Sequence, residues 1–127
     1  MTTWESGRES QLLDSIIAGR KTIEGRLNKG KFAKYKVGDI VWLRRDHRDE
    51  SGILHDGEPH AAEVEVTAIR QYRTFLEMTM TEDYKAVIPY ATSAQEAADA
   101  YNAYYSPHDQ MQYGVLAIQI KYLTPLG

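Results

Sequence analysis

The stretch of this 127-residue chain with the most chemical potential is GRKTIEGR, residues 19–26. It places Lys21, Glu24 and Arg26 close together, directly after an apolar segment. A carboxylate among cations can act in proton transfer, or it can fix the charge and direction of neighbouring ammonium and guanidinium groups. These three residues are therefore the first candidates for a catalytic or binding site.

The spacing of Glu24 and Arg26 predicts an ion pair. In a strand, side chains two positions apart point to the same face. Lys21 has the opposite parity and joins the pair only if the chain turns at Gly19. One interpretation is a local ion pair that only neutralises charge within a sheet. The alternative is that Glu24 orients Lys21 and Arg26 as fixed cationic donors for a ligand.

The state of charge of Lys21 decides between two kinds of chemistry. A lysine that acts as a base near pH 7 needs a pKa far below its ordinary value of about 10.4. Burial and nearby cations lower the pKa of a lysine, whereas an adjacent carboxylate raises it. With Glu24 beside it, we expect Lys21 to stay charged and to bind a phosphate or polarise a carbonyl.

Charge is distributed unevenly along the chain. The net charge is −3, yet residues 20–48 hold ten of the 15 Lys and Arg residues and only three acidic ones. Such asymmetry indicates an anionic partner at one surface, and a solvated lysine-rich loop is the alternative. Lys29, Lys31 and the exterior cations Arg20 and Arg45 are candidate ligand contacts within this segment.

Tyrosines supply a second element, because the chain has nine of them. Tyr104 and Tyr105 end a predicted helix, and aromatic rings next to a basic groove stack single-stranded bases. Packing against the core is the alternative for both. Ser106 precedes Pro107 and is typical of a helix N-cap, although a helix start there could also bind an anion.

The hydrophobic pattern predicts an α+β fold formed by one domain over residues 1–127. Apolar stripes and caps predict helices, and alternation predicts strands. We expect helices at 9–18, within 73–88, at 93–105 and at 106–112, and strands at 21–26, 39–45, 61–72 and 114–123. Residues 46–60 are polar and predict an exposed loop or hairpin tip.

Several other classes of protein are disfavoured. The chain has no Cys, and His47, His55, His60 and His108 form no paired-ligand motif, so we expect no metal site and no cofactor. No glycine-rich phosphate loop or nucleophile elbow is present. The sequence shows no apolar run long enough for a membrane span and no signal-peptide pattern near residue 1, so we expect a cytoplasmic protein without membrane contact.

GRKTIEGR matches the G-x-K-x-x-E-x-R motif of the ASCH domain at Gly19, Lys21, Glu24 and Arg26. The flanking segments YKVGDIVWL and YGVLAIQI resemble this family too, so the resemblance spans nearly the whole chain. It implies a small PUA-like β-barrel with helices packed against it. It also implies a cleft lined by the motif residues, with RNA or a nucleotide-like molecule, most suitably single-stranded RNA, as the ligand.

The resemblance also implies two enzymatic alternatives, a ribonuclease and an acetylcytidine amidohydrolase. The latter uses a Lys, a Thr and a Glu. Lys21 falls on the Lys position and Glu24 replaces the Thr, so Lys21 and Glu24 are the catalytic candidates if the protein is an enzyme. Glu77, Glu82 and Glu96 are candidates for the downstream carboxylate. A protein-interaction module is a third hypothesis, suggested by the acidic remainder of the chain.

Overall fold

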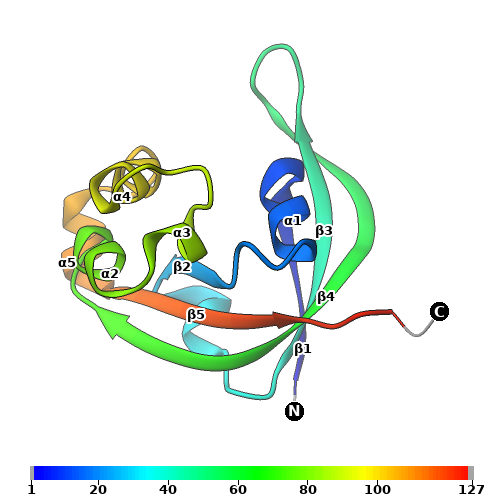
Figure 1. Cartoon of the computed structure of the whole chain (residues 1–127), viewed down its shortest axis with the longest axis horizontal. Coiled ribbons are helices and arrows are strands. Elements are labelled where there is room, and N and C mark those ends of the chain that lie inside the picture. The colour runs from blue at the N-terminus through cyan, green and yellow to red at the C-terminus, as the bar shows by residue number, and fades with distance from the viewer. Residues whose placement is uncertain (1, 126–127) are drawn as a thin grey trace.

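The computed structural model describes residues 2–125 of the chain. Five strands form one sheet in the order β1-β3-β4-β5-β2, and helices lie against it (Figure 1). The strands are β1 (Thr3–Glu9), β2 (Ile23–Leu27), β3 (Ile40–Arg48), β4 (Leu54–Tyr72) and β5 (Val115–Tyr122). The helices are α1 (Ser10–Ile17), the 3-10 helix η1 (Gly30–Lys34), α2 (Phe75–Thr81), α3 (Tyr84–Val87), α4 (Ala94–Asn102) and α5 (Pro107–Tyr113).

The sheet is curved but is not closed by backbone pairing. The 19-residue strand β4 pairs with β3 through its first part and with β5 through its second part, with a register shift between Val66 and Ala68. Such irregularities bend a strand and increase its twist. In the described part of the chain β1 and β2 remain the two edge strands. The α+β class is confirmed. The sheet has the curvature of the expected barrel, but hydrogen bonds between strands do not close it into a complete barrel.

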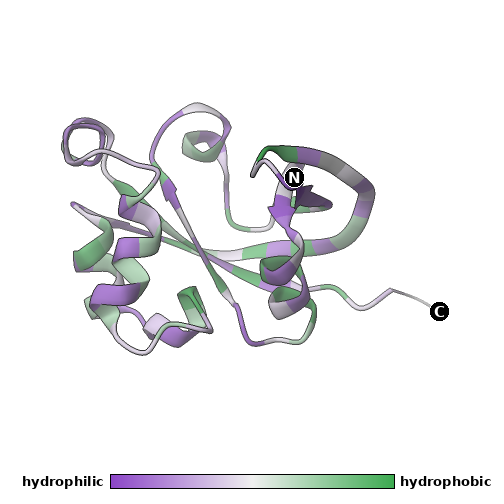
Figure 2. Ribbon diagram, turned by 90° about the horizontal axis from the view of Figure 1, so that it is seen from above, coloured by the Kyte–Doolittle hydropathy of each residue, from purple (hydrophilic) through white to green (hydrophobic). Residues whose placement is uncertain are grey.

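Two hydrophobic clusters hold the molecule together, one on each face of β5. Leu116, Ile118 and Ile120 pack with Leu13 and Ile16 of α1 inside the curved sheet. The alternate residues of β5 pack against the α2–α5 helices on the opposite face. Figure 2 shows hydrophilic and hydrophobic residues alternating along the strand ribbons. Successive residues of β5 thus point to opposite faces of the sheet, as the sequence predicts, and each set packs into its own hydrophobic cluster.

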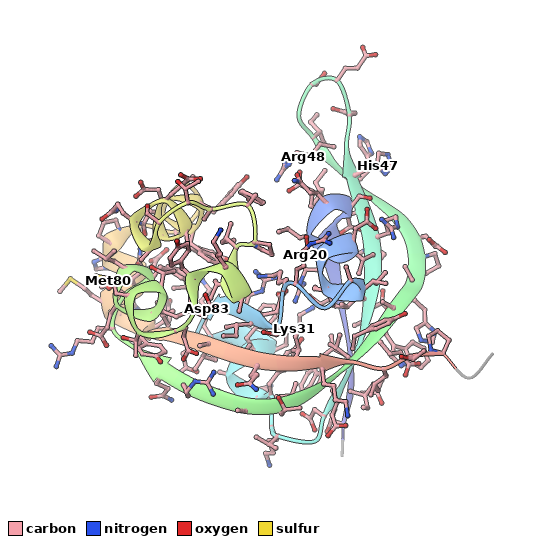
Figure 3. All side chains as sticks on the ribbon, in the orientation of Figure 1. Arg20, Lys31, His47, Arg48, Met80 and Asp83 are labelled. Atoms are coloured by element: carbon pink, nitrogen blue, oxygen red, sulfur yellow. The ribbon has the colours of Figure 1, made fainter. Side chains whose placement is uncertain are left out.

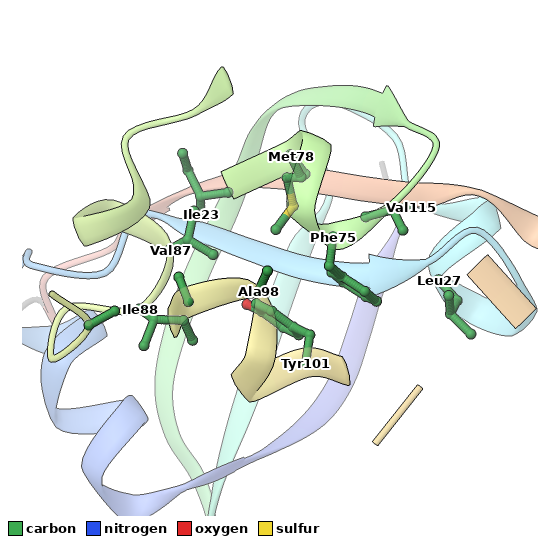
Figure 4. Packing of buried hydrophobic residues seen from close by; sticks show 12 residues of the cluster. Ile23, Leu27, Phe75, Met78, Val87, Ile88, Ala98, Tyr101 and Val115 are labelled. Atoms are coloured by element: carbon green, nitrogen blue, oxygen red, sulfur yellow. The ribbon is translucent and has the colours of Figure 1, made fainter. Parts of the chain in front are cut away.

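The second cluster joins β2 to the helical layer. Ile23 of β2, Phe75 and Met78 of α2, Ala98 and Tyr101 of α4 are all buried in it. Figure 4 shows Tyr101 beside Phe75 and Ala98. The rings of Phe75 and Tyr101 stack with centroids 4.5 Å apart and planes 4° apart. This packing fixes α4 over one end of the β2 strand.

The strand β1 was not predicted, because its hydrophobic signal is weak and its pairing is non-local. It runs parallel to β3, with Thr3 opposite Ile40 and Glu9 opposite Asp46. Buried Asp39 fastens its beginning, since Oδ1 accepts from the Thr2 backbone N–H and Oδ2 from the Trp4 indole N–H. The segment 46–60 forms the end of the β3–β4 hairpin, which is one of its two predicted alternatives, although β3 extends to Arg48 and β4 begins at Leu54.

The predicted helix caps are confirmed. Ser93 accepts a hydrogen bond from the Glu96 backbone N–H, and Ser106 accepts one from that of Asp109. Over residues 2–125 no helix is long and apolar enough to cross a membrane. The single-domain assignment to 1–127 stays a prediction, and residues 1 and 126–127 lie outside the described residues.

Candidate functional site

The predicted cluster lines a pocket of about 150 Å³ between α1, the segment that follows α3, the C-terminal end of α4, and β2. We call it the charged pocket. Its charged lining residues are Arg8, Glu9, Lys21, Glu24 and Arg26. Leu12, Ile88, Tyr90, Ala100, Tyr101, Tyr104 and Tyr105 provide the rest of its wall.

Glu24 is the centre of the charged lining. It is only 4% exposed, and it lies on the same face of β2 as Arg26, as strand parity predicts. Its Oε2 atom lies 2.5 Å from Arg8 Nη2 and 3.3 Å from Arg26 Nη2. Its Oε1 atom lies 3.8 Å from Lys21 Nζ. One buried carboxylate therefore faces three cations.

Arg8 is the site residue that the sequence did not reveal. It is 5% exposed and comes from β1, before the motif. Its Nη1 donates to Ser6 Oγ at 2.7 Å and to the Gly7 carbonyl at 2.6 Å, which directs the guanidinium group toward Glu24. The only sequence signal is that Arg8 alternates with Ser6 and Trp4. The Arg8–Glu24 ion pair links the two edge strands of the sheet.

Lys21 is held by backbone carbonyls as well as by Glu24. The turn at Gly19, which has a φ of 79°, brings it into the pocket wall as expected. Its ammonium donates to the Ile23 carbonyl at 2.8 Å and to the Val87 carbonyl at 2.5 Å. Lys21 therefore tethers β2 to α3, and its donors are largely used within the protein.

Burial lowers the pKa of Lys21 to about 8, with Arg8 and Arg26 acting in the same direction and Glu24 opposing them. At pH 7 this side chain is still mostly an ammonium group. Burial alone would raise the pKa of Glu24, but Arg8, Lys21 and Arg26 outweigh it and lower that pKa to about 2. Glu24 is therefore ionised, and the four groups carry two positive charges in excess.

Three atoms of this cluster lack hydrogen-bond partners. Among the described residues, Glu24 Oε1, Arg8 Nε and Arg26 Nε are buried and unpaired. A buried donor or acceptor without a hydrogen-bond partner costs about 1–3 kcal/mol of stability.

One wall of the pocket is formed by tyrosines that differ in how far they are buried. Tyr101 is buried, and its hydroxyl accepts from the Gly25 backbone N–H at 3.2 Å on the free edge of β2. A Cβ atom at Gly25 would lie 2.8 Å from Tyr101 Cζ, so only glycine fits there. Tyr105 is half-buried and stacks on Phe75, whereas Tyr104 is 70% exposed.

Arg48 reaches the pocket mouth from the β3–β4 hairpin. Its Nη2 donates to the Tyr104 hydroxyl at 3.5 Å, and its Nε lies 3.5 Å from Glu9 Oε1. Figure 3 shows Arg48 at the base of the hairpin, on the side that faces α4. This exposed cation offsets the charge of Glu9 at the entrance, and the sequence did not single it out.

Five of the predicted ligand contacts lie outside the charged pocket. Arg20 is exposed and lines a separate surface pocket with Asp14 and Pro89. Arg45 is engaged by Ser10 Oγ at 2.6 Å and Asp14 Oδ1 at 2.9 Å. Lys29 and Lys31 line a neighbouring pocket. Ser106 is an exposed helix cap that lines none of the pockets named here, so its role there is local.

The three carboxylates proposed downstream do not reach Lys21. Glu82 is bound by Arg70 Nε at 2.6 Å and by the Tyr72 hydroxyl. Glu77 lies in the first turn of α2, and Glu96, in the first turn of α4, accepts from Thr92 Oγ1. Glu9 is the second carboxylate that lines the pocket. Among residues 2–125 no group of three His, Asp or Glu side chains is placed to hold a metal ion.

The fold and the motif define the class of protein. The model of the ASCH domain family matches residues 9–124, and the chain belongs to this family. The resemblance drawn from GRKTIEGR is thereby confirmed. A search of curated proteins found no match.

Solved structures support the same class. The crystal structure of hypothetical protein PH0355 is 33% identical, with a TM-score of 0.79, and the match covers 95% of this chain and 99% of that one. PF0455 from Pyrococcus furiosus is 32% identical with a TM-score of 0.74, covering 97% and 99%. An ASCH domain from Lactobacillus crispatus has a TM-score of 0.62 at 13% identity, covering 95% and 79%, which shows a shared fold.

The low pKa of Glu24 predicts acid-sensitive stability. Because the folded-state pKa is about 2 and the ordinary value is 4.5, its contribution is present above pH 4.5 and is lost as the pH falls toward 2. We expect wild type to lose about 3 kcal/mol more unfolding free energy than Glu24→Gln across this window. Urea unfolding at several pH values measures this difference.

The Glu24 carboxyl ¹³C shift of the wild type provides a control that needs no variant. It should titrate with a midpoint near 2. Parallel loss of stability in both proteins, or a carboxyl midpoint near 4.5, would contradict the electrostatic assignment.

Proposed function

We propose that this protein binds single-stranded RNA and that the charged pocket takes one nucleotide of the strand. The observation that carries this proposal is the buried group of Arg8, Lys21 and Arg26 around a single carboxylate, next to exposed Tyr104. RNA association of the ASCH family supports it. The cytoplasmic location suggested by the sequence stays a prediction.

The excess charge favours an anionic ligand. Three cations against Glu24 and Glu9 leave one positive charge in the pocket lining, and exposed Arg48, which lies beside Glu9, brings the excess to two. Positive potential in a cleft with low-dielectric walls attracts phosphate and raises the rate of encounter. Binding through such contacts weakens as salt increases, because the release of counterions from the nucleic acid gains less free energy in a more concentrated salt solution.

The mixed polarity of the pocket favours a base rather than a phosphate at its floor. A phosphate offers only acceptors and would be repelled by Glu24. A base edge offers both N–H donors and acceptors, which suits a pocket lined by carboxylates as well as by arginine and lysine side chains. Tyr104 provides an aromatic face at the entrance.

The size of the site favours a single strand over a duplex. A volume of about 150 Å³ is small beside the roughly 300–1,000 Å³ of pockets for drug-sized ligands. Bases that enter such a pocket must be unstacked and unpaired, as in loops and single strands. We therefore expect duplex RNA to bind more weakly than a single strand of the same sequence.

Removing the exposed ring should weaken RNA binding without affecting the fold. Stacking of a base on an aromatic side chain contributes about 1–3 kcal/mol. We expect Tyr104→Ala to raise the Kd of a short single-stranded RNA about tenfold or more at low salt. Fluorescence anisotropy with a labelled oligonucleotide measures the effect, and circular dichroism checks the fold.

Trp42→Ala is the matched control. Trp42 is also an exposed aromatic residue, but it stacks on His60 and lines none of the pockets that contain the motif residues. Its variant should bind like wild type. No RNA affinity for wild type at low salt would reject the proposal and leave a protein-interaction module as the better hypothesis.

A hydrolase is the second candidate, and the lowered pKa of buried Lys21 favours it. Two features oppose it. The ammonium group of Lys21 already donates to two carbonyl groups, and Glu77, Glu82 and Glu96 lie outside the pocket. We therefore infer that Lys21 positions the site and carries charge, and that binding is its primary role.

Turnover of acetylcytidine and of single-stranded RNA separates the two candidates. We expect no product above background from wild type. Substrate turnover that disappears in folded Lys21→Ala, with single-stranded RNA still bound, would establish the enzyme instead. Glu82→Gln serves as the control, because Glu82 is paired with Arg70 away from the pocket.

A further inference from the structure

A second pocket adjoins the charged one. It has a volume of about 240 Å³ and is lined by Lys29, Lys31 and Phe32, among others. We call it the lysine pocket. Arg26 and Tyr105 line both pockets, so the two sites adjoin at these side chains.

Arg26 lies at the boundary between the two pockets, and part of its side chain is exposed to solvent. Its side chain is 19% exposed, and its guanidinium carbon lies 5.0 Å from the centroid of the Phe32 ring. Nη2 faces Glu24, while Nε has no hydrogen-bond partner among the described atoms. An arginine held by a carboxylate and an aromatic ring is well oriented for a phosphate group.

The lysine pocket combines cations with aromatic faces. The ammonium groups of Lys29 and Lys31 lie 4.9 Å and 5.4 Å from the ring centroids of Tyr113 and Phe32. Lys31 Nζ also donates to the Glu5 carbonyl at 2.6 Å. Partial burial lowers the pKa of Lys31, and the cations Arg8, Arg26 and Arg44 lower it further. The local potential is therefore positive.

We propose that a single RNA strand spans both pockets, with one nucleotide in the charged pocket and its neighbour in the lysine pocket. The phosphate that links them crosses Arg26. This inference rests on the proposed function and specifies its ligand, which is an oligonucleotide of at least two residues rather than a free nucleoside or mononucleotide.

The arrangement of the lining residues supports this path. Phosphate contacts position a strand, and successive bases use successive aromatic platforms. The charged pocket offers Tyr104, the lysine pocket offers Phe32, and Tyr105 lies between them. Each pocket alone is small for more than one nucleotide, whereas together they accommodate a short strand.

The test is a series of uridine ligands of one, two, three and four nucleotides, titrated by calorimetry at low salt. We expect affinity to rise about tenfold or more from one to three nucleotides, because each added stacked base strengthens binding. In the variant Lys29→Ala/Lys31→Ala this gain should fall to about threefold or less. Loss of two phosphate contacts should also reduce the salt dependence of tetranucleotide binding, by about 1.4 in log–log slope.

The matched control is Lys36→Ala/Lys121→Ala, which removes the same charge from exposed positions that line neither pocket. It should keep the full gain with length. Mononucleotide binding without a gain would overturn the two-pocket path while the proposed function stands. An unchanged gain in the Lys29→Ala/Lys31→Ala variant would overturn it in the same way. Failure to bind at every length would overturn the proposed function itself.

Discussion

The structure depends on one buried carboxylate. Glu24 on β2 pairs with Arg8 on β1, so a side-chain ion pair connects the edges of a sheet that backbone hydrogen bonds leave open. Lys21 extends the same group to α3 through the Val87 carbonyl. Removing one partner of a buried pair leaves an uncompensated charge, which is strongly destabilising. The G-x-K-x-x-E-x-R motif therefore has a structural role, whatever ligand it binds.

The proposed function rests on the incomplete compensation of that charge. A neutral cluster would serve stability alone, but three cations face one carboxylate, and several of their polar atoms remain unpaired. The pocket keeps this arrangement because its surroundings are rigid. Gly25 admits Tyr101 against the β2 edge, and Tyr101 stacks on Phe75 in the helical core. This packing fixes the positions of the charged groups, and the ligand that we propose for them is an anion that also carries hydrogen-bond donors.

The sequence correctly predicted those features of the site that depend on residues close together in the chain. Strand parity placed Glu24 with Arg26, the Gly19 turn brought Lys21 to them, and Ser93 and Ser106 are caps as their spacing indicates. Arg8 could not be found in this way, because β1 reaches Glu24 only through the parallel pairing with β3 and the curvature of the sheet. For the same reason the engagement of Arg45 by α1 was not foreseen, since charge alone does not show which cations are already paired.

The central claim is that Arg8 and Glu24 act as one unit that joins the sheet edges. A double-mutant cycle tests it most directly, with urea unfolding of wild type, Arg8→Met, Glu24→Gln and the double variant at pH 7. The account predicts a coupling free energy of about 2 kcal/mol or more, as expected for a buried charge pair in direct contact. A coupling below about 0.5 kcal/mol, the level of independent sites, would contradict it.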